Sequence, residues 1–255
     1  MNRFALIIES SDVKGQTDLP GARKDASNWS RFLMSNAGGA WDASEIRILN
    51  KPLLELVSYY LEDHRQDYCF VAYSGHGCEI KHHSWDSRGT PTVCLNESEQ
   101  QVPLASLLPH GKYGTLVSDS CRGHEVLQKT AADFSDRGGS RAMSAEDSAG
   151  SFSRILHRNA WNLELQHHCT GLRDILAMYS CASGQSADES PDAGGLYTSL
   201  LIRCAEIWYG ISKAGMCYTT WDAHVAAEAI MKKVSPQQCP EYDRLPTMFP
   251  FAVKA

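Results

Sequence analysis

The chain has 255 residues, of which 43% are hydrophobic and 21% charged, and its formal net charge is -6. This length suits one large α/β domain or two small ones, with enough buried surface to fold without disulfide or metal staples. The acidic balance argues against direct nucleic-acid binding. No stretch approaches 18 apolar residues, and no apolar h-region of signal-peptide length follows a basic start. We therefore expect neither a membrane span nor a signal peptide.

The cysteine content points to a reducing compartment. Nine cysteines are present, an odd number, and none of their spacings forms a CxxC pair. This pattern favours free thiols in a cytoplasmic protein over a disulfide framework.

The first half of the chain predicts strands alternating with helices. Short apolar runs indicate strands at residues 4–8, 46–49, 68–73 and 115–118. The run at 68–73 is apolar on both faces, which is typical of a parallel sheet covered by helices. Apolar residues at helical spacing predict a helix over 22–35, ended by Gly38 and Gly39, and a second helix that begins near Pro52.

The second half continues the alternation after an unusual segment. Residues 131–150 are rich in Ser, Asp and Gly with few large apolar groups, so we expect a mobile linker there. A strand at 174–179, helices at 197–208 and 223–234, and an edge strand at 248–252 follow. The predicted fold class is α/β, with an open, mostly parallel sheet.

Two of the predicted strands run into candidate catalytic motifs. Residues 68–73 precede Ser74-Gly75-His76-Gly77, and residues 115–118 precede Asp119-Ser120-Cys121-Arg122-Gly123. Ligands bind beyond the carboxyl ends of parallel strands. If these strands are neighbours, an imidazole and a thiol meet at one rim of the sheet. The imidazole would take the thiol proton and later protonate a leaving amine. Arg122 would add positive potential, and the N–H groups of Gly77 and Cys121 would stabilise an oxyanion.

Each motif alone has an ordinary structural explanation. His76 would be incidental in a loop, and Cys121 a buried thiol at a strand end. Together they lie 45 residues apart, each after an apolar strand. An amidotransferase-like thiol enzyme is one alternative, but there the His follows the Cys. A binding module without turnover is another, and the intact His–Cys pair counts against it.

The combination resembles the caspase clan, and metacaspases and bacterial caspase-like members of peptidase family C14 more than animal caspases. Cys121-Arg122-Gly123 fits the caspase pattern, with a His upstream, although Asp119-Ser120 replaces the usual Gln-Ala. Supporting similarity lies at residues 19–25, 73–77, 117–121, 179–186, 195–198, 240 and 249–250.

The resemblance implies a three-layer α/β/α fold with a mostly parallel six-stranded sheet. It makes residues 1–255 a single peptidase domain, with a large-subunit-like part at 1–130, a linker at about 131–165 and a small-subunit-like part at 166–255. It implies peptide-bond hydrolysis through a thioester, with Cys121 as nucleophile and His76 as acid/base.

The resemblance also implies an acidic substrate pocket. Its acids fall at Asp25 and Asp119, with Ser74 beside them, and two carboxylates would bind Arg or Lys, Arg the better. The alternative roles are a solvated helix acid for Asp25 and a strand-end hydrogen bonder for Asp119. Cleavage after Asp would instead need Arg23 and Arg122 in the pocket.

The sequence departs from the metacaspase pattern in two respects. Ser183 replaces a further pocket acid, although Asp188 and Glu189 follow shortly. The acids after the His motif are too scattered for the six to eight oxygens of calcium, so we expect no cofactor: Glu79, Asp86, Glu97 and Glu99. For Cys78, His82 and His83, a solvated loop is the better explanation than a zinc site.

The linker acquires a meaning from the resemblance, because caspases are cut between their two subunits there. Lys129, Arg137 and Arg141 are basic residues that an Arg-specific peptidase would cut in itself, with Arg154 and Arg158 just beyond. An uncut flexible loop is the alternative. The expected partners are a protein or peptide substrate and an activating partner or ligand, with neither nucleic acid nor membrane. A role in bacterial defence or cell death rests on family analogy alone.

Overall fold

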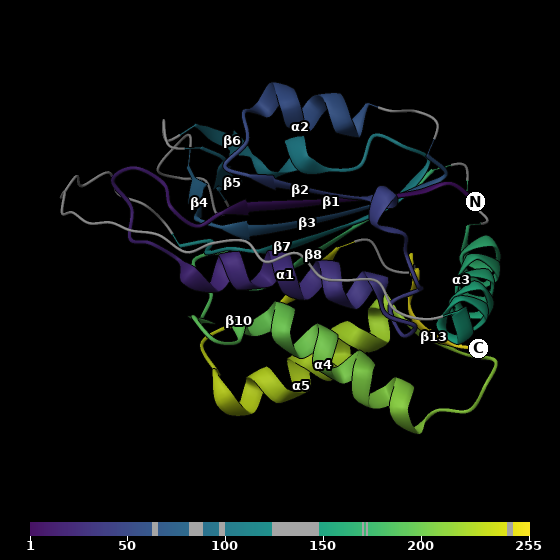
Figure 1. The fold of residues 1–255 in the computed structure, drawn as a ribbon. Coiled ribbons are helices and arrows are strands. Elements are labelled where there is room, and N and C mark those ends of the chain that lie inside the picture. Colours follow the sequence, from purple (N-terminus) through teal and green to yellow (C-terminus); the bar gives the residue numbers. More distant parts are fainter. Residues whose placement is uncertain are drawn as a thin grey trace.

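A computed structural model describes residues 1–62, 66–81, 89–96, 100–123, 148–169, 171, 173–243 and 247–255, the side chains of 148–151 excepted. A six-stranded sheet lies between two helical layers (Figure 1). Its strand order is β12-β8-β7-β3-β1-β2. The strands are β1 (Arg3–Ser10), β2 (Ile46–Asn50), β3 (Tyr68–Gly75), β7 (Tyr113–Asp119), β8 (Asp174–Tyr179) and β12 (Glu241–Asp243).

Five strands are parallel and β12 pairs antiparallel with β8. Every residue of β3 and β7 is buried, because these strands lie at the centre of a sheet covered on both faces. The predicted α/β class and mostly parallel six-stranded sheet are confirmed.

Helices cover the two faces unequally (Figure 1). One face carries α1 (Pro20–Met34), α4 (Leu196–Ile211) and α5 (Thr220–Val234), and α3 (Ser148–His168) packs at its end. The other carries α2 (Leu54–Leu61) and the 3₁₀ helix Leu104–Leu107; a second 3₁₀ turn, Ala43–Glu45, precedes β2. Because successive strand residues point to opposite faces, Ile7 packs under α1 while Leu6 and Ile8 face α2.

Three small sheets complete the described fold. β4 (Gly77–Ile80), β5 (Thr90–Cys94) and β6 (Gln101–Pro103) form an antiparallel sheet directly after β3. β9 (Glu189–Ser190) pairs with β10 (Gly194–Gly195), and β11 (Met216–Thr219) pairs with β13 (Pro250–Lys254). Of the strands in these three sheets, only β13 overlaps a predicted strand, the one at 248–252.

Two expectations about the second half need correction. The predicted edge strand at 248–252 does not join the main sheet; β12 is its outermost strand, and β13 pairs with β11. Phe249 and Phe251 are buried among core aromatics, a position that an exposed rim would not offer. Residues 148–165, assigned to the linker, lie in helix α3, because Trp161 and Leu165 bury one face of it. Residues 131–147 lie outside the described part of the chain.

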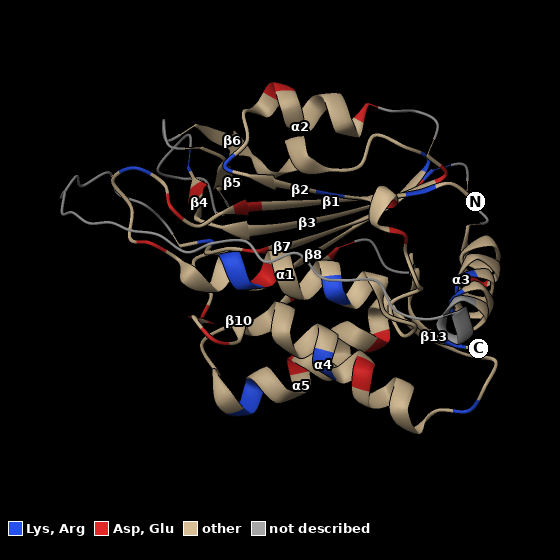
Figure 2. Cartoon of the chain, in the orientation of Figure 1, with Lys and Arg blue, Asp and Glu red and all other residues tan. Residues whose placement is uncertain are grey.

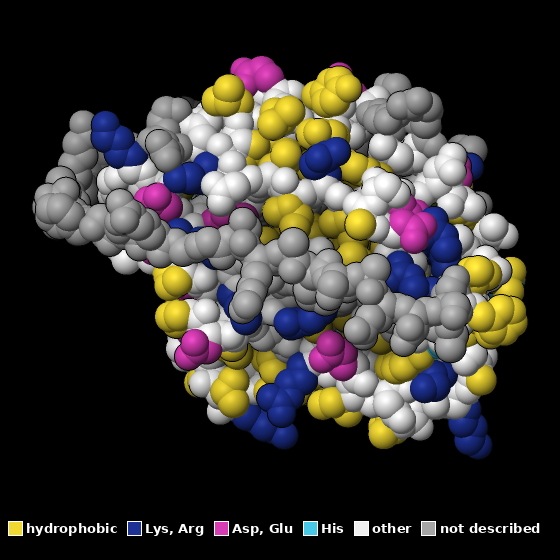
Figure 3. Space-filling model, in the orientation of Figure 1, with side chains coloured by type: hydrophobic (Ala, Val, Ile, Leu, Met, Phe, Trp, Pro, Cys, Tyr) yellow, Lys and Arg dark blue, Asp and Glu magenta, His cyan; other side chains and the backbone are white. Residues whose placement is uncertain are grey.

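The surface mixes charges of both signs. Helices α1, α4 and α5 each carry both acidic and basic residues (Figure 2). Hydrophobic side chains gather over α2 (Figure 3), where Leu53, Leu56 and Tyr59 are exposed. Among the described helices, none is long and apolar enough to cross a bilayer.

Candidate active site

The two predicted catalytic residues follow neighbouring strands. β3 and β7 pair in register with Ser74 opposite Asp119, and His76 and Cys121 each come two residues later. A Cβ built on Gly77 would lie 2.7 Å from the Cys121 carbonyl oxygen. Only glycine therefore lets the two loops touch. The structure thus brings the His and Cys motifs to one rim of the sheet.

Hydrogen bonds hold both the ring and the backbone of His76. Its Nε2 lies 2.6 Å from the Thr17 carbonyl oxygen. Because a carbonyl only accepts, Nε2 carries the proton, and Nδ1 is the basic nitrogen of the neutral ring. The hydroxyl of Tyr73 lies 2.7 Å from the His76 carbonyl oxygen, and the Cys94 N–H donates to the same oxygen. Sequence reasoning missed Thr17, which acts through its backbone.

The thiol of Cys121 is partly exposed and is contacted by the segment after β8. The Ala187 N–H donates to Sγ at 3.3 Å. The Arg122 N–H donates to the Gln185 carbonyl, and the Gly184 N–H donates to the Arg122 carbonyl, both at 2.8 Å. These bonds hold the sulfur and the residue that follows it against the segment after β8.

Arg122 is part of an ion-pair network. Its guanidinium lies 2.7 Å from the carboxylate of Glu79, whose side chain is fully buried, and also pairs with Glu241. It stacks on the Tyr179 ring with 4.9 Å to the centroid. The expectation that Arg122 adds positive potential beside the thiol is therefore wrong, because two carboxylates balance its charge.

Asp25 and Asp119 form a buried acidic pair, 1% and 6% exposed. Asp25 accepts hydrogen bonds from Ser74 Oγ at 2.9 Å and the Gly195 N–H at 3.0 Å. Asp119 accepts from the Thr198 N–H at 2.9 Å. Both carboxylates thus meet the positive end of α4. The predicted pocket residues Asp25, Ser74 and Asp119 lie together, and the solvated-acid alternative for Asp25 is wrong.

Burial and mutual repulsion change the acidity of this pair. Burial, and next the neighbouring Asp119, raise the pKa of Asp25 to about 8. Burial likewise raises the pKa of Asp119, although hydrogen bonds from Thr198 and Ser180 oppose the shift. Two carboxyls this close cannot both ionise without a cation, so the pair retains a proton near neutral pH.

Gly195 permits this arrangement. A Cβ at this position would overlap the Asp119 carboxylate and lie 2.9 Å from Asp25 Oδ2. The glycine lets the backbone at the start of α4 reach both acids.

Glu189 supplies a third carboxylate that the sequence analysis noted only as an acid following Ser183. It accepts hydrogen bonds from the N–H groups of Gly21 and Ala22 in the first turn of α1. Burial raises its pKa, and Asp119 adds to the shift. The Asp188 carboxylate instead accepts a hydrogen bond from the Ser235 hydroxyl.

The remaining candidate residues have other partners or lie outside the described residues. Arg23 pairs with Asp18 at the surface. Arg158 pairs with Asp42 and Glu45 from within α3, and Arg154 also bonds to this region. Of the acids considered for calcium, Glu79 is bound by Arg122. Asp86, Glu97, Glu99, His82, His83, Lys129, Arg137 and Arg141 lie outside the described residues.

Sheet order and the His and Cys motifs at adjacent strand ends define a caspase-like protein. The chain belongs to the caspase domain family, peptidase family C14, whose match spans residues 2–249. No curated protein matches the sequence. Among solved structures, protein GSU0716 from Geobacter sulfurreducens is similar over 100% of both chains, with a TM-score of 0.60 and 17% sequence identity. At that identity the likeness concerns the fold.

Proposed function

We propose that this chain is a cysteine endopeptidase that cleaves proteins after Arg or Lys. Cys121 is the nucleophile and His76 the general acid/base. The observation that carries the proposal is the register of β3 and β7, which sets the two motifs side by side at the carboxyl rim of the sheet.

The chemistry follows from the groups at that rim. Nδ1 of His76 takes the thiol proton, and Sγ of Cys121 attacks the scissile carbonyl carbon. The N–H groups of Gly77 and Cys121 stabilise the resulting oxyanion. The imidazolium then protonates the leaving amine, and water hydrolyses the thioester with the same ring as base. The Thr17 carbonyl keeps the ring in the required tautomer, and the Ala187 N–H stabilises a thiolate.

The acidic pair supports basic specificity. Asp25 and Asp119 cannot both ionise until a cation joins them. A guanidinium would bind both carboxylates with parallel hydrogen bonds. Glu189 adds negative potential beside them. Arg23 and Arg122, which Asp specificity would require, are each paired with carboxylates elsewhere.

Substrate entry requires a rearrangement. Both pocket carboxylates are bonded to backbone N–H groups at the start of α4 and are almost completely buried. A basic side chain must displace the Gly195 contact before it reaches them. This closed arrangement supports control by an activating ligand, partner or cleavage event.

Fluorogenic peptides ending in Arg, Lys or Asp test the proposal. We expect turnover of the Arg and Lys peptides, abolished in Cys121→Ala and His76→Ala and retained in Cys239→Ala, whose thiol is exposed. Labelling by an Arg-based electrophile gives a second measurement if turnover awaits activation, and it should reach Cys121 alone. Equal turnover by Cys121→Ala, or cleavage after Asp alone, would refute the assignment.

Self-processing at Lys129, Arg137 or Arg141 is a separate part of the proposal. Intact-mass spectrometry of the purified chain should show cuts after these residues in the wild type. The Cys121→Ala chain should stay whole under the same conditions. Identical cuts in both chains would assign the cleavage to another protease.

A further inference from the structure

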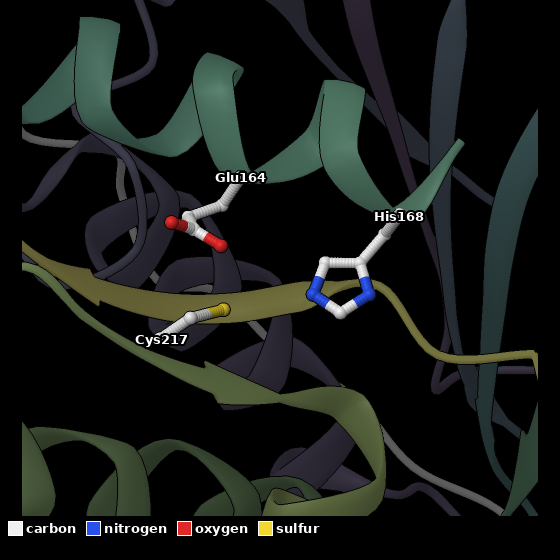
Figure 4. A group of neighbouring side chains, drawn as sticks. All are labelled: Glu164, His168 and Cys217. Atoms are coloured by element: carbon white, nitrogen blue, oxygen red, sulfur yellow. The ribbon is translucent and has the colours of Figure 1, made fainter. Parts of the chain in front are cut away.

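Three metal-ligating side chains meet between helix α3 and strand β11, away from the proposed active site. Glu164 and His168 are four residues apart, so they project from one face of α3. Cys217 of β11 faces them across the gap, as Figure 4 shows. One ligand atom from each residue lies within 4.8 Å of the other two. All three side chains are partly buried.

We propose that Glu164, His168 and Cys217 form a zinc-binding site. A thiolate, an imidazole and a carboxylate are the donors that proteins offer to Zn²⁺, whereas Ca²⁺ and Mg²⁺ require oxygen ligands. Three protein ligands leave the fourth tetrahedral position for water. The site is independent of the peptidase assignment, because it uses none of the residues of that mechanism.

The coordination geometry is within reach of these side chains. Tetrahedral bonds of about 2.0–2.3 Å place ligand atoms about 3.3–3.6 Å apart. The three atoms are already within 4.8 Å, so side-chain rotations bring them together without moving the backbone elements. Cys217 is anchored opposite Val253 in the β11–β13 ribbon, and Trp161 and Leu165 anchor α3 in the core.

The juxtaposition of Glu164 and Cys217 itself favours a cation. The carboxylate and the sulfur lie together in a partly buried site, where a carboxylate and a thiolate would repel each other. A divalent cation between them removes the repulsion and pairs with both anions. Binding therefore releases a proton from the thiol, and affinity falls as the pH falls.

The site joins two parts of the fold that lie at the far end of the sheet from His76 and Cys121. The Tyr113 hydroxyl, at the start of β7, bonds to the Cys169 carbonyl at the end of α3. Cys121 follows the other end of this seven-residue strand, roughly 20 Å away. A zinc ion there clamps α3, the first described element after residues 124–147, onto the β11–β13 ribbon. Its role is structural, holding α3 in place whether or not the preceding segment is cut.

Metal titration of the full chain tests the site. The Cys121→Ala background removes the other thiol–imidazole pair as a competing ligand set. We expect one Zn²⁺ per chain by calorimetry, and a Co²⁺ adduct with tetrahedral ligand-field bands and a thiolate-to-cobalt charge-transfer band. Loss of an outer-shell partner weakens metal sites about 10–100-fold, so Cys217→Ser, His168→Ala and Glu164→Gln should each weaken binding by about 100-fold or more.

Matched variants keep the test specific. His167→Ala removes the exposed imidazole that lies 4.0 Å from the Glu164 carboxylate, so it tests whether His168 rather than His167 supplies the nitrogen ligand. Cys204→Ser removes a partly buried thiol on α4, and both variants should bind as the background does. Zn²⁺ should raise the thermal midpoint of the background and these controls but not that of the three ligand variants. Circular dichroism before titration confirms that each variant is folded. Absence of binding in the folded background, or equal binding by Cys217→Ser, would overturn the proposal.

Discussion

The buried Asp25–Asp119 pair makes a prediction about stability that is independent of catalysis. With the pKa of Asp25 raised to about 8, the folded chain holds a proton that the unfolded carboxyl, with a pKa near 4, has lost at neutral pH. Stability falls with rising pH wherever the native state binds more protons. This carboxyl therefore contributes stability below about pH 4 that is lost progressively as the pH rises to about 8.

The size of the effect follows from one proton. A whole proton changes the free energy of unfolding by about 1.4 kcal/mol per pH unit. Because the pair shares its proton, we expect about 1 kcal/mol per unit for Asp25. Asp25→Asn keeps an acceptor for the Gly195 N–H and adds donors, but it has no charge to repel Asp119. From about pH 5 to about pH 8 the variant should gain about 3 kcal/mol over the wild type.

Urea unfolding of both chains across this pH range measures the difference. Asp192→Asn removes an exposed carboxyl from the turn between β9 and β10 and should follow the wild type at every pH. Cys121→Ala in all chains prevents self-cleavage during the measurement. A difference between Asp25→Asn and the wild type that does not change with pH would show that Asp25 is already ionised, and the reasoning would fail.

Three further substitutions test separate parts of the structure by urea unfolding. Arg122→Met leaves the fully buried Glu79 carboxylate without its partner and should cost about 3–5 kcal/mol, part of which Glu79→Gln restores. Trp161→Ala should cost about 3–5 kcal/mol because α3 packs in the core. A cost below about 1 kcal/mol would contradict this packing and favour the assignment of α3 to the linker. Thr219→Ala removes the capping box that Thr219 forms with Asp222 at α5, for about 1 kcal/mol, and Thr219→Ser should restore most of it.

The centre of the sheet was predictable because two of its strands are apolar on both faces. β1 and β3 contain the continuous apolar runs 4–8 and 68–73, and few other structures bury such runs. Helix α3 was not predicted because most of its residues are polar. The apolar residues Trp161 and Leu165, which share one helical face, do not stand out among them. The sheet of β4, β5 and β6 was not predicted, because the formation of short antiparallel strands depends on tertiary pairing more than on their own residues.

The site residues that act through their side chains could be predicted from the sequence. His76 and Cys121 follow strands and Asp119 ends one, and parallel topology alone brings strand ends together. Asp25 lies in α1, and only the family resemblance placed it in the pocket. Thr17 and Ala187 contribute only backbone groups, which any residue supplies, so no sequence pattern marks them. Arg122 was misassigned because its partners, Glu79 and Glu241, are 43 and 119 residues away in sequence.

The acidic pair links recognition to control. The carboxylates that would bind an Arg side chain are the same groups that accept hydrogen bonds from the start of α4. Backbone N–H groups supply partial positive charge, so they leave one proton on the pair. A guanidinium supplies a full charge and lets both acids ionise, which makes it the stronger partner. A basic substrate residue is therefore chemically suited to release the closed pocket, whereas a neutral residue gains nothing by displacing the Gly195 contact.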